Sequence, residues 1–249
     1  MKKIFVLMAV AAMVAVSCQK PANGGKENGG KDNDGKQDEY VQPIKIDGDF
    51  SDWAALDASK VATATCDPDA TDTALKLVKV YADKLFVFVY FEWDTDQTEW
   101  VPDTDHVPFH MYINHDGDSA TGGYADQWSD ACSDMLLEGF LYDANGLASY
   151  DPGCYLWIGE ANASGWGWEP DGENVLASGS GLCQGAGVTS GKYEIALLRE
   201  MYPGKIADNF SIGFDIQKAW TTVGLLPNGA STDENPSGTV PSLQVVTVK

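Results

Sequence analysis

The sequence predicts an all-β fold, a two-sheet antiparallel β-sandwich of jelly-roll-like form with long end loops. Stretches such as Phe109–Asn114 and Asn209–Gln217 alternate apolar and polar residues with the two-residue period of a half-buried strand. Loops rich in Gly, Asp and Asn separate these stretches. No stretch has the apolar period of a long amphipathic helix, which favours two packed sheets over a mixed fold.

The chain begins with the pattern of a secretory signal peptide at residues 1–17. Lys2 and Lys3 precede an apolar run from Ile4 to Val16 that is too short to span a bilayer. The ending at Cys18 resembles a bacterial lipoprotein cleavage site, although alanine stands at position 15 where leucine is usual. We expect lipidated Cys18 to hold the protein on the outer membrane; ordinary secretion with cleavage nearby is the alternative.

Residues 18–42 are expected to form a flexible tether, because they are rich in Gly, Asn, Asp and Lys and contain almost no apolar side chains. The acidic residues of this stretch resemble the export signal of surface lipoproteins in the Bacteroidetes. This favours display on the cell surface, with the periplasmic face as the alternative. Residues 43–249 are then expected to form a single β-sandwich domain.

The first part of this domain predicts three strands. Ile44–Ile46 is a short strand, followed by an Asp-Gly turn and by Trp53, which we expect to fill one end of the sandwich. Residues Ala74–Trp93 predict a hairpin with a tight polar turn around Asp83. Its second strand is apolar on both faces, so it should be central and covered on both sides.

Phe109–Gly139 predicts a strand, an acidic loop and a returning strand at Met135–Leu137. The loop is rich in oxygen-bearing side chains, which are the ligands of hard cations such as calcium. The remaining predicted elements are strands at Tyr155–Ile158, Val175–Gly187, Lys192–Leu198, Asn209–Gln217 and Leu243–Val248, with a helical turn at Arg199–Tyr202.

The charge excludes one class of partner. The chain has 16 Lys and Arg against 37 Asp and Glu, a formal net charge of −21 at pH 7. Nucleic acid would be repelled, because its binding depends on basic side chains that neutralise phosphates. Apart from Cys18 there are four cysteines, at positions 66, 132, 154 and 183. They could form two disulfides in an exported protein, or remain unpaired thiols.

Three stretches in this order resemble the family 9 carbohydrate-binding modules and their wider β-sandwich superfamily: Ile46–Trp53, then Val80–Asp94 followed by Tyr112–Gly123, and finally Lys192–Leu198. The resemblance implies noncatalytic glycan binding and a calcium site in the acidic loop, with Asn114 where relatives have aspartate. The implied metal ligands are Asn114, Asp116, Asp118, Thr121 and Asp134. The loop is no EF-hand, because Ser119 stands at the position of the invariant glycine. A solvated hairpin of Asx-turns is the alternative.

Glycan binding requires aromatic rings on exposed loops, where they can stack on sugar rings. Four tryptophans lie in polar or Gly-rich stretches and are the candidate ligand-binding residues: Trp100, Trp128, Trp166 and Trp168. The others, Trp53, Trp93, Trp157 and Trp220, are expected in the core.

Other functions are possible on the same scaffold. A structural or adhesive surface protein would bury the loop tryptophans and use another face for protein contacts. A glycoside-active enzyme would need two carboxylates facing each other, and the sequence contains no nucleophile motif or phosphate-binding loop. The histidines at 106, 110 and 115 suggest a zinc site only weakly, since their spacing puts them on different strand faces. Haem binding would use His110 or Met111.

Overall fold

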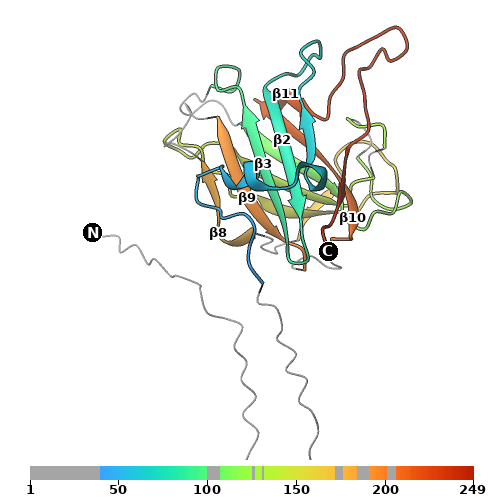
Figure 1. Cartoon of the computed structure of the whole chain (residues 1–249). Coiled ribbons are helices and arrows are strands. Elements are labelled where there is room, and N and C mark those ends of the chain that lie inside the picture. The colour runs from blue at the N-terminus through green and yellow to red at the C-terminus, as the bar shows by residue number, and fades with distance from the viewer. Residues whose placement is uncertain are drawn as a thin grey trace, which may run out of the picture. The chain divides into compact units, whose positions relative to one another are not determined.

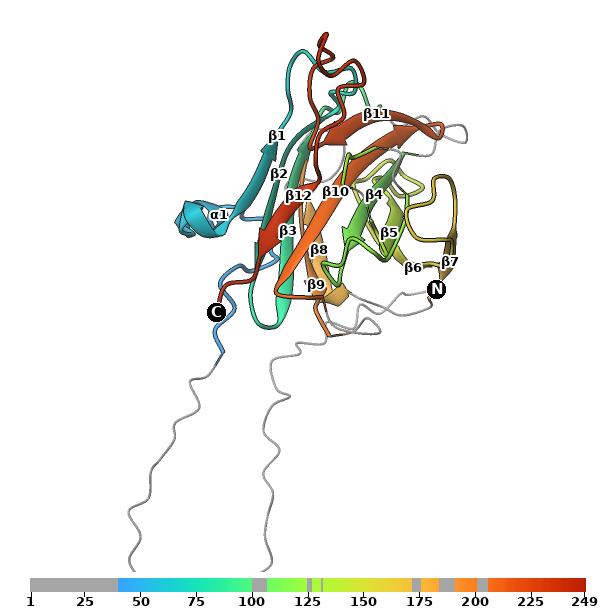
Figure 2. The ribbon, with the colours of Figure 1, turned by 90° about the vertical axis from the view of Figure 1, so that its right-hand side faces the viewer.

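The computed structural model describes residues 40–99, 107–124, 127–130, 132–171, 176–183, 191–200 and 206–249. The expectations for the signal peptide and for Cys18 lie outside these residues. Pro43–Lys249 form one compact unit. It consists of two antiparallel sheets, which confirms the predicted all-β sandwich (Figures 1 and 2). No helix among the described residues has the length and apolar character needed to cross a membrane.

The first sheet has five strands in the order β1-β2-β3-β9-β8. Their bounds are Ala62–Thr65 (β1), Leu75–Ala82 (β2), Phe86–Trp93 (β3), Lys192–Leu198 (β9) and Leu176–Cys183 (β8). The prediction for the second hairpin strand is confirmed, because β3 is central and buried on both faces. Val87, Val89 and Phe91 face the space between the sheets, whereas Phe88 and Tyr90 face outward.

The second sheet has seven strands, in the order β11-β10-β4-β5-β6-β7, with β12 paired to β10. Their bounds are Thr221–Leu226 (β11), Asn209–Lys218 (β10), Pro108–Asn114 (β4), Met135–Phe140 (β5), Gly153–Trp157 (β6), Trp168–Pro170 (β7) and Leu243–Val246 (β12). The alternation read from Phe109–Asn114 determines which side chains of β4 point inward: Phe109, Met111 and Ile113 belong to the main core.

The main core lies between the two sheets. The rings of Phe91 (β3) and Phe109 (β4) stack with centroids 4.2 Å apart, so the central strands of both sheets meet directly. Fully burying one such side chain contributes roughly 1.5–3 kcal/mol to folding. The predicted strands that correspond to β6, β8, β10 and β12 are present with different bounds, and β9 has the predicted bounds.

The chain before β1 covers the outer face of the five-stranded sheet, where Figure 1 shows α1 (Asp52–Ala55) crossing in front of the strands. A 3-10 turn, Ala58–Lys60, follows. Trp53 is buried as expected, but it packs against Phe88 and Tyr90 on this outer face and not at the end of the sandwich. The strand expected at Ile44–Ile46 is wrong: the Lys45 N–H donates to the Asp52 carboxylate, 3.0 Å away, instead of to a neighbouring strand.

Glu194 on β9 fastens this covering segment. Its carboxylate is fully buried and accepts hydrogen bonds from the backbone N–H groups of Asp47 and Gly48 and from Nε1 of Trp53, at 2.9–3.1 Å. Two of the stretches that resemble the carbohydrate-binding modules, Ile46–Trp53 and Lys192–Leu198, therefore meet at a single buried carboxylate.

Candidate functional site

A buried charged centre lies on the outer face of the seven-stranded sheet. His110 (β4) is directly opposite Asp215 (β10) on one side and Glu138 (β5) on the other. Its Nδ1 is hydrogen-bonded to the Asp215 carboxylate, and its Nε2 lies 2.8 Å from Glu138 Oε2. The side chains of His110 and Asp215 are almost wholly inaccessible, whereas Glu138 is 16% exposed. Glu138 is thus the member of the centre that reaches the surface.

Two amide side chains also donate hydrogen bonds to Asp215. Gln127 and Gln217 each donate from Nε2 to Asp215 Oδ2 at 2.9 Å. Gln127 belongs to the loop between β4 and β5, so this contact holds the loop down on the sheet. Its own Oε1 is buried and has no hydrogen-bond partner among the described residues.

The imidazole of His110 is a cation at neutral pH. Burial by itself lowers the pKa of His110, but the charges and hydrogen bonds of Asp215 and Glu138 outweigh burial and raise the pKa to about 9. The centre therefore carries one positive and two negative charges. The imidazole ring occupies the space between the two carboxylates, so they cannot flank a glycosidic bond as a hydrolytic pair would.

A layer of buried aromatic rings continues this face beyond the charged centre. Tyr112, two residues after His110, stacks on Tyr124 with centroids 4.5 Å apart and planes 5° from parallel. Trp128 packs on the backbone of Gly213, where an added Cβ would lie 2.6 Å from the indole ring. Trp128 Nε1 donates to the carbonyl of Pro227 at 3.1 Å. These rings hold the β4–β5 loop in place.

Two pairs of aromatic side chains remain accessible on the same sheet. Trp166, in the loop between β6 and β7, is 61% exposed and meets the ring of Tyr155 (β6) edge to face, with centroids 6.4 Å apart. At the other end, Trp220 in the β10–β11 turn is 57% exposed and meets Phe140 (β5), which is 42% exposed, in the same way at 6.3 Å.

The structure separates the four candidate tryptophans. Trp166 is exposed as expected, and Trp100 lies outside the described residues. The expectation of exposed rings is wrong for Trp128 and Trp168, which are 1% and 5% exposed because they pack on Tyr112. The expectation that Trp220 belongs to the core is also wrong, since it occupies a left-handed position in a tight turn that points it to solvent.

The predicted calcium ligands form a chain of local turns. Asn114 Oδ1 accepts from Gly117 N, and Asp116 Oδ1 accepts from Asp118 N, both at 2.8 Å. Thr121 donates from Oγ1 to the Asp116 carboxylate. Asp134 instead contacts His115, which is not one of the predicted ligands: Asp134 Oδ1 lies 2.6 Å from His115 Nδ1. Within the described part of the chain, no three His, Cys, Asp or Glu side chains gather as a metal-binding group.

The zinc and haem alternatives gain no support from the histidines and methionine that suggested them. His110 is held between two carboxylates, and His115 contacts Asp134. Met111 is fully buried in the core between the sheets. His106 lies outside the described residues.

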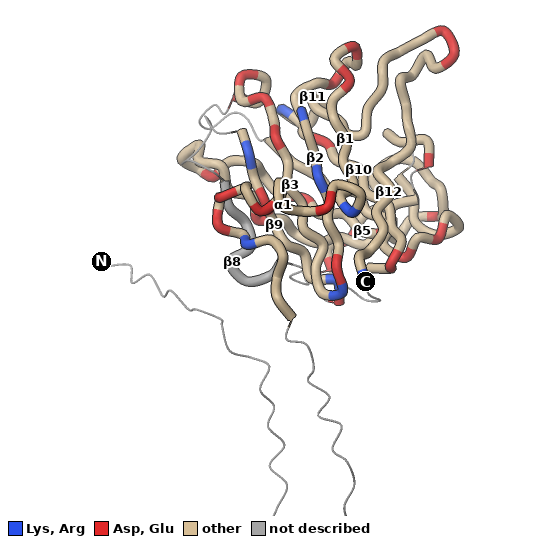
Figure 3. The backbone as a smooth tube through the Cα atoms, viewed as in Figure 1, with Lys and Arg blue, Asp and Glu red and all other residues tan. Residues whose placement is uncertain are grey.

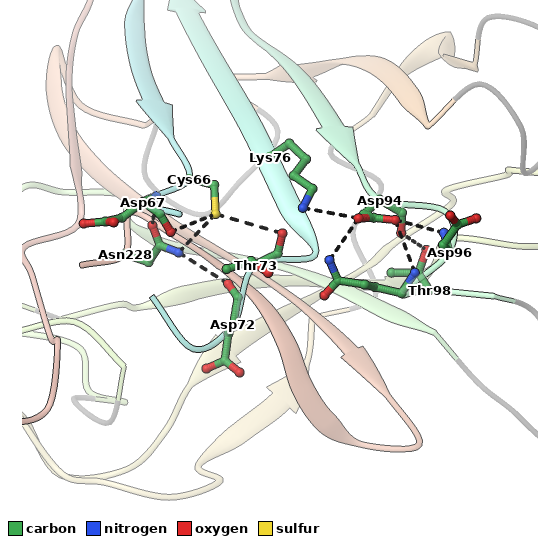
Figure 4. A network of polar contacts seen from close by, with 10 residues as sticks. Cys66, Asp67, Asp72, Thr73, Lys76, Asp94, Asp96, Thr98 and Asn228 are labelled. Atoms are coloured by element: carbon green, nitrogen blue, oxygen red, sulfur yellow. Dashed lines mark hydrogen bonds and ion pairs between the residues drawn. The ribbon is translucent and has the colours of Figure 1, made fainter. Parts of the chain in front are cut away.

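A second polar network lies at the end of the sandwich where β2 begins (Figure 4). Asn228 donates from Nδ2 to Cys66 Sγ at 3.6 Å and to the backbone carbonyl of Asp72 at 3.3 Å. Cys66 and Cys132 are free thiols, so the four cysteines at positions 66, 132, 154 and 183 do not form two disulfides. The Asp72 carboxylate points away from this network, and burial together with the charge of Asp215 raises its pKa.

Sequence reasoning missed Glu138 and Asp215. A signal was present, because each is the only acid in its strand, Met135–Phe140 or Asn209–Lys218, and stands at an outward position next to apolar residues. A buried charge at such a position requires a partner of opposite charge. The local sequence pattern does not show which strands are neighbours, so it could not identify His110 as that partner.

Comparison of the sequence with models of protein families and with curated proteins gives no match.

Proposed function

We propose that this chain is a lipoprotein of the cell envelope whose β-sandwich binds a glycan without altering it chemically. The observation that carries the proposal is the exposed ring of Trp166, braced edge-on by Tyr155. A largely exposed indole leaves apolar surface in water, and a sugar ring that stacks on it covers that surface. The resemblance to carbohydrate-binding modules supports the same function.

The proposed anchor is the lipidated Cys18, with residues 18–42 as the tether that separates the sandwich from the outer membrane. The signal-like run before Cys18 and the polar composition of the tether support this location. Metabolic labelling with a radioactive or clickable fatty acid should mark the protein. Cys18→Ser should abolish the label and release the protein into the soluble fraction.

Calcium remains part of the proposal, bound in the loop from Asn114 to Thr121. The fit is partial: the carboxylates of Asp116 and Asp118 are exposed on one turn, whereas Asp134 is directed to His115. When bound, calcium would supply a cross-link between carboxylates and backbone carbonyls of this loop.

We expect Asp116→Ala to lower the melting temperature of the protein in calcium but not in chelator, because the side chain would stabilise the fold mainly through the ion. Differential scanning calorimetry in both conditions measures this. Asp143→Ala is the matched control, since Asp143 also caps an exposed Asx-turn through Asn145 and Leu147. Equal melting of Asp116→Ala and parent in calcium would show that the loop is merely solvated.

Trp166→Ala should weaken glycan binding by at least about tenfold, the equivalent of about 1.4 kcal/mol, because it removes the stacking surface. A glycan array, run with and without chelator, identifies the ligand, and calorimetry then compares the variants. Ile158→Ala is the control, since Ile158 is an exposed apolar residue near the same loop. Absence of binding to any glycan in calcium would contradict the proposal.

A structural or adhesive role is the second candidate function. The burial of Trp128 and Trp168 favours it, because that role predicts loop tryptophans packed inside the fold. It predicts no glycan on the array and adhesion of cells that is lost when the chain is removed.

A further inference from the structure

The two exposed aromatic pairs share one face. On β5 the outward side chains are Leu136, Glu138 and Phe140, because alternate residues of a strand point to the same side. On β6, Tyr155 stands opposite Leu136 and belongs to the outer aromatic cluster. The contacts with Trp166 and Trp220 extend this face at both ends, beyond strands that Figure 2 shows side by side.

Glu138 lies between the pairs, and 16% of its side chain is exposed. The residue opposite it on β6 is Gly153, which has no side chain to cover the carboxylate. The ring of Tyr155 leans toward Gly153, 3.2 Å from where a Cβ would stand, and the Tyr155 hydroxyl is hydrogen-bonded to Glu138. Burial and this carboxylate raise the pKa of Tyr155. The face therefore has ring surfaces at both ends and a hydrogen-bond acceptor between them.

The spacing of the pairs exceeds the width of one sugar. Phe140 is four residues further along β5 than Leu136, the partner of Tyr155, which corresponds to about 14 Å along the strand. A monosaccharide cannot reach both pairs, whereas an oligosaccharide can lie across them. Its hydroxyl groups would then donate to Glu138.

The negative charge of the protein determines whether a charged or an uncharged glycan can bind. Glu138 is an acid, and the chain as a whole has a net charge of −21. Figure 3 shows Asp and Glu distributed over the loops, with Lys and Arg much rarer. A glycan with carboxylate or sulfate groups would be repelled, so the ligand should be uncharged.

We propose that Trp166, Tyr155, Glu138, Phe140 and Trp220 form a binding track for an internal stretch of a neutral polysaccharide chain. This inference rests on the proposed function and adds the ligand class, the mode of binding and the second aromatic pair. Trp220 provides the far stacking surface, and Glu138 receives hydroxyl groups between the two ends.

Native affinity electrophoresis of the mature chain tests the ligand class. The probes are mixed-linkage β-glucan, galactomannan and arabinoxylan as neutral polysaccharides, with polygalacturonate and chondroitin sulfate as acidic ones. We expect retardation by a neutral polysaccharide and none by the acidic ones. Stronger retardation by the acidic probes would overturn the assignment of the ligand class.

Calorimetry with fragments of the retained polysaccharide tests the track. Affinity should rise from the monosaccharide to longer oligosaccharides. Trp220→Ala should weaken binding of the long fragments by at least about tenfold. Val246→Ala is the control, because Val246 is a similarly exposed apolar residue on β12. Melting temperatures should be unchanged, since Trp220 is largely exposed.

The outcomes separate this inference from the proposed function. If Trp166→Ala weakens binding and Trp220→Ala does not, the track is wrong and glycan binding at Trp166 stands. If neither substitution weakens binding, both sites are wrong. If none of the probes retards the chain and the glycan array is also empty, the proposed function fails and the track fails with it.

Discussion

The free energy of unfolding is expected to fall by about 3 kcal/mol as the pH rises from about 6.5 through 9, because each unit of pKa difference corresponds to about 1.4 kcal/mol. Folding raises the pKa of His110 from 6.5 to about 9. The folded protein therefore binds the proton more tightly than the unfolded chain. The stabilisation is fully present below pH 6.5 and is lost as the pH passes through the folded-state pKa, when two carboxylates face a neutral ring.

Urea unfolding at several pH values between 6 and 10 measures this loss. His110→Gln is the comparison, because it removes the titrating group and retains hydrogen-bonding capacity. The variant should be less stable at pH 6 and should show a flatter dependence across the window. Subtracting the variant's curve removes contributions from thiols and other groups. Parallel curves for parent and variant would show that His110 is not the group that responds.

Glu194→Ala is expected to destabilise the protein by roughly 3–5 kcal/mol, because it leaves three donors in the covering segment without their acceptor. These donors are the backbone N–H groups of Asp47 and Gly48 and the Nε1 of Trp53. Glu194 is fully buried, so water cannot replace the carboxylate without rearrangement. The segment before β1 should then detach from the five-stranded sheet and expose Phe88 and Tyr90.

Glu194→Gln separates the hydrogen bonds from the packing. The amide oxygen can still accept from Asp47 and Gly48, but its NH2 group would face the donor of Trp53, so the loss should be smaller than for alanine. Trp53→Phe removes that donor, and the combination of Glu194→Gln with Trp53→Phe should cost less than the sum of the single changes. Tryptophan fluorescence measured during urea unfolding reports whether the covering segment, which contains Trp53, is still docked on the sheet. A loss below about 0.5 kcal/mol for Glu194→Ala would contradict an anchoring role.

The strands that sequence analysis located best are those with strong alternation or continuous apolar runs, such as Phe86–Trp93 and Phe109–Asn114. Three strands were not predicted. Ala62–Thr65 consists of small and hydroxyl-bearing residues, and Trp168–Pro170 is only three residues long, so neither carries a periodic signal. Thr221–Leu226 begins directly after the turn at Trp220, and its pairing with β10 is what defines it as a strand.

The candidate site was predictable only in part, because the exposure of a loop side chain also depends on residues that are distant in the sequence. Trp166 lies in a Gly-rich loop and is exposed, but the same local argument was wrong for Trp128. Gly213, on a strand far along the chain, provides the flat backbone on which the Trp128 ring packs. Burial of a loop side chain therefore depended on a residue that no local pattern connects to it.

The alternation of side chains along each strand follows from the sequence alone, because backbone geometry makes successive residues point to opposite faces. It determined that His110, Glu138 and Asp215 leave the core on the outward side. Only the strand order β10-β4-β5 brought them together, since His110 is 28 residues from Glu138 and 105 from Asp215. Pairing between distant strands is decided by the packing of the whole sheet. The same packing therefore determines the charge of His110 and the partial exposure of Glu138.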